Sequence, residues 1–329
     1  MFPTLHENAA CHMQKLFFLL LLAISTTTCF SQSTVAFTIP EKDLIPEGIC
    51  YDAANKRFYV SSILKNKIVQ VSDGIVSDFI TSDRDGFIGG VGLHVDARRN
   101  ILWACTFNAI HDVPRTGIFA FDIHSGKTIK KAFYPQDSIK HLFNDLTIAD
   151  DGTIFITDSY DGSIYEWNAS QETPRRLKLP HALPGLNGIV ISPDNKYLFV
   201  AADTGIARID LTFYTIRMLA KPGMAYSSRG LDGLVFYKNS LIGVQNGPPP
   251  GEKPKIIRYY LSGDLGDIQK AALIEEGNKF FQVPTTAAVV GDELYVIANS
   301  QLDNVDQREM KIIHPEKLTE TFILKYKLR

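Results

Sequence analysis

A short sequence unit recurs six times along this chain and constrains its fold more than any other feature. Each unit opens a strand of apolar residues, turns, and continues into a second strand rich in Phe, Tyr, Val and Ile. The first residues of the six units, here called the lead positions, are Glu47, Val91, Asn144, Asn187, Asp232 and Thr285. They are 43 to 53 residues apart. Periods in this range are typical of β-propellers, in which each repeat forms one blade.

The spacing of the units predicts an all-β fold, a six-bladed β-propeller formed as a single domain by residues 32–329. No segment shows an apolar period of 3.6 over twelve residues, which would have indicated a helix. The early strand Thr34–Ile39 is expected to share a blade with the C-terminal strand Thr321–Lys327. This pairing would remove the free edges that an open sheet exposes.

Residues 1–31 have the features of a signal peptide, and Met13 is an alternative start. Lys15 precedes the apolar run 16–24, which is too short to span a bilayer and resembles the apolar core of an export signal. We therefore expect an exported protein, secreted or periplasmic, with no stable membrane span. Lipidation at Cys29 is disfavoured, because the three threonines before it fit a lipidation motif poorly.

The composition favours a small molecule over a macromolecular partner. The chain has 34 basic and 36 acidic residues, well mixed, and a net charge of −2. No basic patch that would bind nucleic acid is visible. Once a signal peptide is removed, Cys50 and Cys105 remain, and we expect two buried free thiols rather than the alternative of a disulfide, because both lie inside apolar strands.

Four of the six lead positions carry oxygen ligands, namely Glu47, Asn144, Asn187 and Asp232. The innermost strands of a propeller line its central channel, so these side chains should converge near the axis. Two carboxylates brought so close would repel each other, and a bound cation would relieve the repulsion. A set of oxygen ligands suits Ca²⁺ best, although Zn²⁺, Mn²⁺ and Mg²⁺ remain open. Asn-Gly and Asp-Gly are also ordinary turn dipeptides, which leaves a turn role as the alternative.

The ordered set of these four residues resembles the gluconolactonase family, which includes the senescence marker protein and the luciferin-regenerating enzyme. The likeness rests on Pro46-Glu47-Gly48, Phe143-Asn144-Asp145, Leu186-Asn187-Gly188 and Leu231-Asp232-Gly233. It implies a six-bladed propeller with a divalent cation in the central channel. It also implies that Glu47, Asn187 and Asp232 are metal ligands, and that Asn144 is a further ligand or holds water or substrate.

Two positions depart from the family pattern. Leu142 stands where many sugar-lactone hydrolases of the family carry an arginine, and Val91 stands where paraoxonase-type relatives carry a histidine. Neither an aldonolactone substrate nor the paraoxonase dyad is therefore supported. A more apolar ester or lactone fits the sequence better.

These observations predict a metal-dependent hydrolase of a lactone or related ester, in which water attacks a metal-polarised carbonyl group. Asp232 is the first choice for the base, and Glu47 is the second. Direct nucleophilic attack by Asp232 is the alternative route.

Four further residues are expected at the rim of the pocket: His141, His111, Leu142 and Asn246. The two histidines are candidates for a base or proton shuttle near neutral pH. The loop that begins at Asn246 should lie on the same face of the propeller as the lead positions. The competing hypothesis is a non-catalytic propeller that binds a small molecule and holds a structural calcium.

Overall fold

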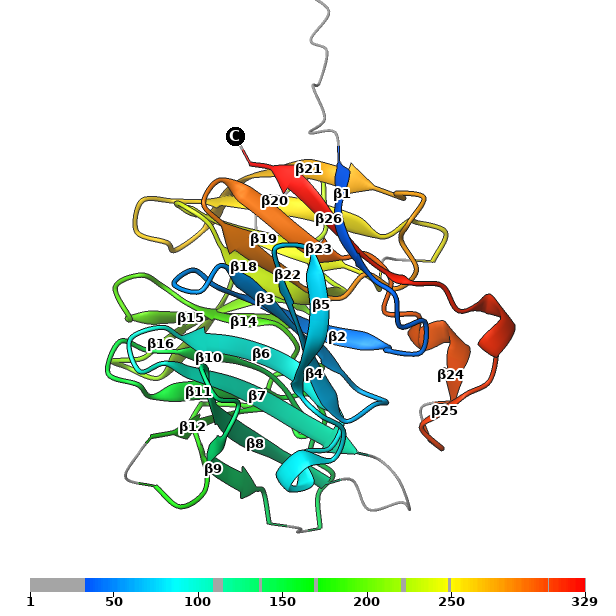
Figure 1. Ribbon diagram of the computed structural model, residues 1–329. Helices are drawn as coiled ribbons and strands as arrows, with labels where there is room; N and C mark the ends of the chain where they lie inside the picture. The colour runs from blue at the N-terminus through cyan, green and yellow to red at the C-terminus, as the bar shows by residue number, and fades with distance from the viewer. Residues whose placement is uncertain are drawn as a thin grey trace, which may run out of the picture. The chain divides into compact units, whose positions relative to one another are not determined.

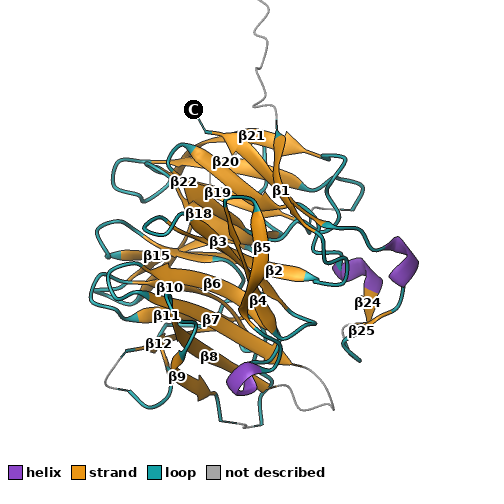
Figure 2. Cartoon of the chain, viewed as in Figure 1, coloured by secondary structure: helices purple, strands orange, loops and turns teal. Residues whose placement is uncertain are grey.

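The described part of the chain forms six four-stranded antiparallel sheets, which are the blades of a β-propeller (Figures 1 and 2). The structure, a computed structural model, describes residues 33–108, 115–135, 138–168, 171–219, 223–247, 250–306 and 308–328. All of these lie in the second of two units into which the chain divides, Ser31–Arg329. The all-β, six-bladed fold expected from the repeats is confirmed. The expected signal peptide, residues 1–31, and His111 lie outside the described residues.

Each of the first five blades is a meander of four consecutive strands. Blade 1 contains β2 (Pro46–Asp52), β3 (Arg57–Ser62), β4 (Lys67–Ser72) and β5 (Ile75–Ile80). Blade 2 contains β6 (Gly90–Asp96), β7 (Ile101–Asn108), β8 (Arg115–Asp122) and β9 (Thr128–Phe133). Blade 3 contains β10 (Phe143–Ile148), β11 (Ile154–Asp158), β12 (Ser163–Trp167) and β13 (Arg175–Arg176). Blade 4 contains β14 (Ile189–Ile191), β15 (Tyr197–Ala202), β16 (Gly205–Asp210) and β17 (Thr215–Leu219). Blade 5 contains β18 (Leu231–Phe236), β19 (Ser240–Gln245), β20 (Lys255–Leu261) and β21 (Ile268–Glu276).

Blade 6 combines the two ends of the described chain. Its strands are β22 (Ala287–Val290), β23 (Glu293–Ile297), β26 (Thr321–Lys327) and β1 (Thr34–Ile39). Strand β1 pairs with β26 from Thr34 opposite Lys325 to Ile39 opposite Thr321. The predicted closure is thus confirmed, with the predicted strand limits. It gives the last blade a full set of partners and joins the ends of the propeller.

Short elements lie outside the blades. The 3₁₀ turn η1 (Arg84–Gly86) precedes blade 2. The connection from β23 to β26 contains η3 (Leu302–Asn304), β24 (Val305–Asp306), β25 (Lys311–Ile312) and η4 (Pro315–Lys317). Among the described residues, no helix is long and apolar enough to cross a membrane.

The apolar core lies between neighbouring blades. Between blades 2 and 3, for example, Trp103 packs edge-on against Trp167 with ring centroids 5.6 Å apart, and Phe143 and Cys105 belong to the same cluster. Burial of these large side chains supplies most of the favourable free energy that holds one blade to the next. Cys50 and Cys105 are both buried and free, as expected.

Candidate functional site

The four oxygen-bearing lead residues line one cavity at the inner strands. Glu47, Asn144, Asn187 and Asp232 come from four different blades and share a cavity of about 340 Å³, here called the central cavity. The rest of its described wall is Ile63, Val91, Phe107, Leu142, Tyr160, Asn246, Val283, Leu302, Asp303, Val305 and Met310. Several of these come from connections between the second and third strands of their blades, the place from which the sequence predicted the rim.

A β-bulge places three of the four ligand residues. In blade 1, Pro46 pairs with Ser62 and Ile49 with Val60, so Glu47 and Gly48 together face a single residue. The same shift occurs at Asn144 in β10 and at Asp232 in β18. A bulge adds one residue to a strand and turns a side chain away from the regular alternation. Glu47, Asn144 and Asp232 therefore lie in bulges of the inner strands rather than in ordinary turns. Asn187 lies just before β14.

The glycine that follows a lead residue allows neighbouring inner strands to approach each other. A Cβ atom on Gly188 would lie 2.5 Å from the backbone nitrogen of Leu234 and 2.6 Å from the backbone oxygen of Asp232. A Cβ on Gly92 would lie 2.5 Å from Oδ1 of Asp145. Neither contact is sterically possible without a shift of the backbone or the carboxylate. These glycines therefore set how closely the ligand-bearing strands gather around the axis.

Hydrogen bonds between blades hold the lead positions relative to one another. The backbone nitrogen of Gly188 donates to the backbone oxygen of Asp232 at 2.8 Å. The hydroxyl of Thr285 donates to the backbone oxygen of Glu47 at 3.0 Å, and that of Thr157 donates to the backbone oxygen of Asn187 at 2.7 Å. Each bond satisfies a buried polar group and fixes the strand that carries a ligand. The site is thus built on rigid backbone.

The two carboxylates of the central cavity are half-buried, and the loss of solvent around each raises its pKa. Burial and the negative charge of Asp232 raise the pKa of Glu47 well above its usual range. Burial raises the pKa of Asp232 to about 7, and the charge of Asp145 adds to the rise, while hydrogen bonds from Asn246 and Asn187 oppose it. A positive charge placed between these carboxylates would reverse both shifts.

The side-chain amides are oriented by their own partners. The amide nitrogen of Asn144 donates to the hydroxyl of Ser159 at 3.0 Å, and that hydroxyl donates to the backbone oxygen of Leu186. The amide nitrogen of Asn144 is thereby occupied, so its oxygen is the atom left for a ligand. Asn246 donates from Nδ2 to Oδ2 of Asp232. The donor set therefore consists of carboxylate and amide oxygens, which suit a hard divalent cation such as Ca²⁺.

The expected rim residues divide into two groups. Leu142 and Asn246 line the central cavity. His141 does not belong to its wall, although it is adjacent to Leu142 in the chain. In an extended segment successive side chains point to opposite sides, and His141 is buried on the other side, with only 5% of its surface exposed. Its ring packs against that of Tyr134 at a tilt of 58°, with centroids 4.6 Å apart.

His141 forms a buried polar group with Asp158 and Asp161. Its Nδ1 lies 2.5 Å from Oδ2 of Asp158, while Oδ1 of Asp158 accepts from the backbone nitrogen of Leu142 at 3.0 Å. The hydroxyl of Tyr165 donates to Asp161 at 2.9 Å. The ligand atoms of His141, Asp158 and Asp161 lie within 4.8 Å of one another, close enough to hold a metal ion. The hydrogen bonds already made by this group give it a structural role in holding the segment that bears Leu142.

The comparisons with known proteins were made by sequence and by structure. No family model and no curated protein matches the sequence. The fold is similar to a gluconolactonase from Xanthomonas campestris (TM-score 0.60, 14% identity, 90% of this chain and 88% of that one). It is also similar to the calcium-binding protein regucalcin from Agrobacterium tumefaciens (TM-score 0.58, 18% identity, 90% and 96%). The PQQ-bound aldose sugar dehydrogenase from Streptomyces coelicolor is comparably similar (TM-score 0.59, 14% identity, 90% of this chain and 98% of that one).

These likenesses show the fold. A gluconolactonase and a luciferin-regenerating enzyme, both named in the sequence resemblance, are among the structural neighbours, together with the calcium-binding regucalcin. The dehydrogenase uses the same architecture for different chemistry. What this chain does must therefore be argued from its own site.

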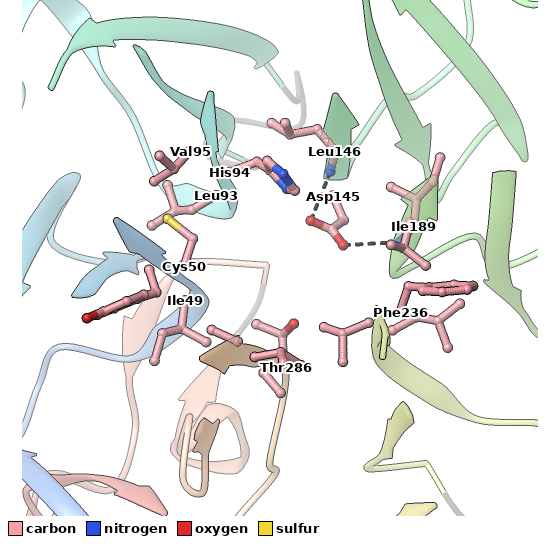
Figure 3. A pocket seen from close by; sticks show the side chains of 17 residues that line it. Ile49, Cys50, Leu93, His94, Val95, Asp145, Leu146, Ile189, Phe236 and Thr286 are labelled. Carbon is pink, nitrogen blue, oxygen red and sulfur yellow. Dashed lines mark hydrogen bonds between the residues drawn. The ribbon is translucent and has the colours of Figure 1, made fainter. Parts of the chain in front are cut away.

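Sequence reasoning missed Asp145, which belongs to a second cavity of about 270 Å³ farther along the inner strands (Figure 3). Its carboxylate accepts from the backbone nitrogens of Leu146 at 2.9 Å and of Ile189 at 3.1 Å. Burial raises the pKa of Asp145 to about 7. The hydrogen bond from Ile189 joins blade 3 to β14, the strand that follows Asn187. A signal was present, since four of the six units carry glycine at the place that Asp145 occupies.

His94 and Cys50 also line this second cavity, as Figure 3 shows. Burial lowers the pKa of His94 to about 4, so its imidazole is neutral near pH 7. Burial raises the pKa of the Cys50 thiol well above its usual range, with further contributions from Asp52 and Asp145.

Proposed function

We propose that this protein is a metal-dependent hydrolase of a lactone or related ester, with its active site in the central cavity. The observation that supports this most directly is the convergence of Glu47, Asn144, Asn187 and Asp232 on that cavity from four blades. Two half-buried carboxylates with raised pKa values and two amides, without sulfur or imidazole, form a set suited to a hard cation. Calcium is the proposed ion.

The residues present fit such an ion. Glu47, Asn187 and Asp232 would hold it directly, and Asn144 would hold it or a water molecule beside it. When bound, the cation supplies Lewis-acid polarisation of the substrate carbonyl and stabilises the negative charge that develops on its oxygen. The carboxylates contribute the negative charge that keeps the ion in place.

Asp232 is the proposed proton acceptor. During hydrolysis a water molecule passes a proton to Asp232 as its oxygen bonds to the carbonyl carbon. The ester C–O bond then breaks, and Asp232 returns the proton to the leaving oxygen, which gives an acid and an alcohol, or one hydroxy acid from a lactone. The hydrogen bond from Asn246 fixes the rotation of the Asp232 carboxylate. A fixed carboxylate favours proton transfer to its other oxygen, because less rotational freedom has to be lost on the way to the transition state. The apolar wall around the polar base limits the entry of other water molecules.

We also propose that the protein is exported, on the basis of the signal-like segment in residues 1–31. An oxidising or extracellular setting would provide calcium at concentrations that suit a site of modest affinity. Detection of a shortened N-terminus in protein recovered outside the cytoplasm of an expressing cell would support export. Recovery of the full-length chain in the cytoplasm alone would contradict it.

The hydrolase proposal is tested with a panel of lactones and aryl esters. Purified protein is assayed with calcium, with a chelator, and as the Asp232→Asn variant, which keeps the size of the side chain and removes its charge. Asp73→Asn is the matched control, because Asp73 is exposed and far from the cavity in a β4–β5 turn. We expect turnover that is lost with the chelator and in Asp232→Asn and is retained in Asp73→Asn.

The panel also separates the competing hypothesis of a binding protein. A folded, calcium-loaded protein that binds a lactone but hydrolyses no member of the panel would contradict the hydrolase proposal. The apolar residues of the cavity wall favour this second hypothesis, because they provide affinity for a ligand without taking part in a reaction.

A further inference from the structure

The connection between β23 and β26, residues 298–320, forms a flap over the central cavity. The corresponding connection in blade 4 consists only of residues 203–204, between β15 and β16. The flap contains the small β24–β25 sheet, which lies beside the blades rather than within them (Figure 1). An insertion of this size at the mouth of a pocket has room to shape what enters it.

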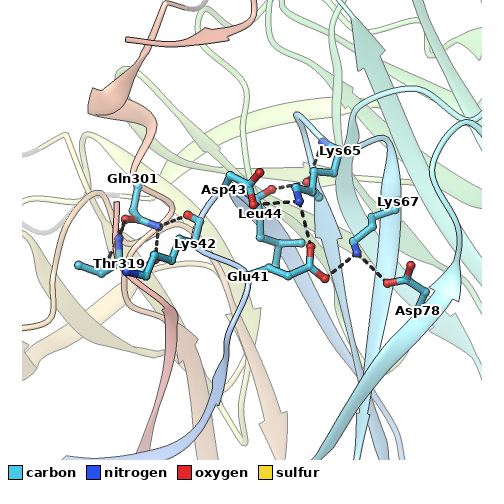
Figure 4. A network of polar contacts seen from close by, with 10 residues as sticks. Glu41, Lys42, Asp43, Leu44, Lys65, Lys67, Asp78, Gln301 and Thr319 are labelled. Carbon is cyan, nitrogen blue, oxygen red and sulfur yellow. Dashed lines mark hydrogen bonds and ion pairs between the residues drawn. The ribbon is translucent and has the colours of Figure 1, made fainter. Parts of the chain in front are cut away.

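Hydrogen bonds fix the base of the flap on the segment that leads into blade 1. Nε2 of Gln301 donates to the backbone oxygens of Lys42 at 3.2 Å and of Thr319 at 3.0 Å (Figure 4). Oε1 of Gln301 accepts from the backbone nitrogen of Thr319 at 2.7 Å. The side chain of Gln301 is fully buried. This single amide therefore joins both ends of the flap to a neighbouring blade.

Ion pairs stiffen the blade-1 side of this contact. Lys67 lies 2.6 Å from Glu41 and 2.7 Å from Asp78, and Lys65 lies 2.8 Å from Asp43 (Figure 4). The ammonium group of Lys67 is largely buried, so its two carboxylate partners are needed to offset its desolvation. The segment on which the flap rests is thus well ordered.

An apolar cluster holds the flap down above the cavity. Val305 and Leu318 pack with Ile45, and the partly buried side chains around them include Ile63, Leu64, Leu302 and Ile312. Some members of this cluster also line the cavity, namely Ile63, Leu302 and Val305. The flap is therefore a fixed part of the cavity wall.

The flap gives the cavity an apolar side. It contributes Leu302, Val305 and Met310 to the wall, and Asp303 is its one charged residue there. The described wall contains no lysine, arginine or histidine. A polyhydroxylated substrate would need hydrogen-bond partners for each hydroxyl group, because leaving them unpaired costs about 1–3 kcal/mol each. The three apolar flap residues cannot supply such partners.

We propose that the flap selects a small lactone or ester that carries an unbranched alkyl chain. The reacting group would lie near Glu47 and Asp232, and the chain would pack against Leu302, Val305 and Met310. At about 340 Å³, the cavity is near the lower end of the range of ligand pockets, about 300–1,000 Å³, so it should accept a chain of limited length. This inference rests on the proposed function for the reacting group.

The test uses two matched series of compounds with the calcium-loaded protein. The first is a set of γ-lactones whose alkyl chain grows from methyl to decyl, assayed for kcat/KM beside gluconolactone. The second is the corresponding set of γ-lactams, which resist hydrolysis, measured for Kd by calorimetry. We expect Kd to fall by roughly fourfold for each added methylene group until the cavity is full, and then to rise. Gluconolactone should be the poorest lactone substrate.

Variants assign the selectivity to the flap. Met310→Gln keeps the length of the side chain and makes it polar, and Val305→Thr keeps its shape. Both should weaken binding of long-chain lactams by about tenfold and leave the methyl lactam within about twofold. Ile313→Gln is the control, because Ile313 lies on the same flap, is 51% exposed and does not line the cavity. Thermal unfolding of each variant checks that the fold is retained.

The two series distinguish this inference from the proposed function. Lactam binding that strengthens with chain length, without turnover of any lactone, would overturn the hydrolase proposal and support the inference. Lactone turnover that is independent of chain length, or that favours gluconolactone, would overturn the inference and leave the hydrolase proposal standing. Failure of every lactam to bind would also overturn the inference, as would an equal effect of Ile313→Gln.

Discussion

Asn246 donates a hydrogen bond from Nδ2 to Oδ2 of Asp232, so one oxygen of this half-buried carboxylate is engaged before any ligand enters the central cavity. This bond lowers the pKa of Asp232 against the larger effect of burial. Asn246, which directly follows β19, therefore influences the ionisation of the proposed base Asp232 in the neighbouring strand β18. A change at Asn246 should therefore alter the pKa of Asp232.

Replacing Asn246 with alanine should move the pKa of Asp232 upward from about 7, because burial then acts with less opposition. We expect the acidic limb of the pH dependence of kcat/KM to move to higher pH, and calcium to bind more weakly near pH 6 than near pH 8 relative to the unaltered protein. Calorimetric titration with calcium at the two pH values measures the second effect without relying on activity. Equal weakening at both would mean that Asn246 acts only through packing.

Replacing His141 with alanine should destabilise the fold and spare the reaction. The change removes one member of a buried pair with Asp158, and breaking such a pair typically costs about 3–5 kcal/mol. Because His141 does not line the central cavity, kcat should stay within about threefold of that of the unaltered protein at temperatures where the variant is folded. Urea denaturation provides the free energy of unfolding. Undiminished stability with lost turnover would return His141 to the role of proton shuttle expected from the sequence.

Replacing Gly188 with alanine should weaken calcium binding from a position that touches no ligand atom. The new methyl group would meet the backbone of Leu234 and Asp232 at 2.5 and 2.6 Å, which forces two inner strands apart. Overpacking of this kind costs about 1–3 kcal/mol of stability. Gly263→Ala is the matched control, since a Cβ there has no neighbour within 4 Å, and it should change stability by less than about 0.5 kcal/mol. Calcium affinity and thermal unfolding of both variants test the contrast.

The metal-free protein should lose stability as pH rises between about 4 and about 7. The pKa values of Glu47 and Asp232 are raised in the folded state, so the folded protein holds protons that the unfolded chain has released in this window. Fewer protons bound to the unfolded state mean a free energy of unfolding that falls with pH. Calcium takes the place of these protons, so the stabilisation by excess calcium should grow across the same window.

His94 acts in the opposite direction, because its lowered pKa makes the folded state bind fewer protons than the unfolded chain between about pH 4 and about pH 6.5. Comparing unfolding with calcium and with a chelator at each pH cancels its contribution. A calcium-dependent stabilisation that stays constant from acid to neutral pH would argue against a cation between Glu47 and Asp232.

Removing β1 should open the propeller at blade 6. A chain that begins after Ile39 lacks the partner of β26 and leaves an exposed strand edge, which promotes association between molecules. A chain that begins at residue 32 keeps β1 and is the control. Light scattering after size-exclusion chromatography should show aggregates of the shorter chain and no change in the control. A monodisperse, equally stable shorter chain would show that closure through β1 is dispensable.

The repeat pattern was sufficient to predict the blades, because each unit combines apolar alternation with turn residues over a short stretch of chain. It also predicted that β1 pairs with β26, because pairing the first and last strands satisfies the free backbone groups that each would otherwise expose. The four ligand residues could be placed in one cavity because equivalent positions in a radial array must approach its axis. Leu142 and Asn246 followed from the same argument.

Residues defined by contacts between blades could not be predicted in this way. The side of the chain on which His141 lies depends on the alternation at the start of β10, and its pairing with Asp158 depends on the neighbouring strand. Asp145 stands where most units carry glycine, which marks it in the sequence, but its bond to the backbone of blade 4 cannot be read from that position. A lone polar residue gives no information about which distant backbone group will meet it.

The sequence by itself determined that six similar units would close around an axis and that carboxylate and amide oxygens would meet there, because periodicity fixes equivalent positions. Only the tertiary structure decided how closely the inner strands approach at Gly188 and Gly92, which hydrogen bonds orient Asp232, and that residues 298–320 cover the cavity with apolar side chains. These features depend on packing between segments far apart in the chain, where the free energy of each contact is set by its three-dimensional neighbours.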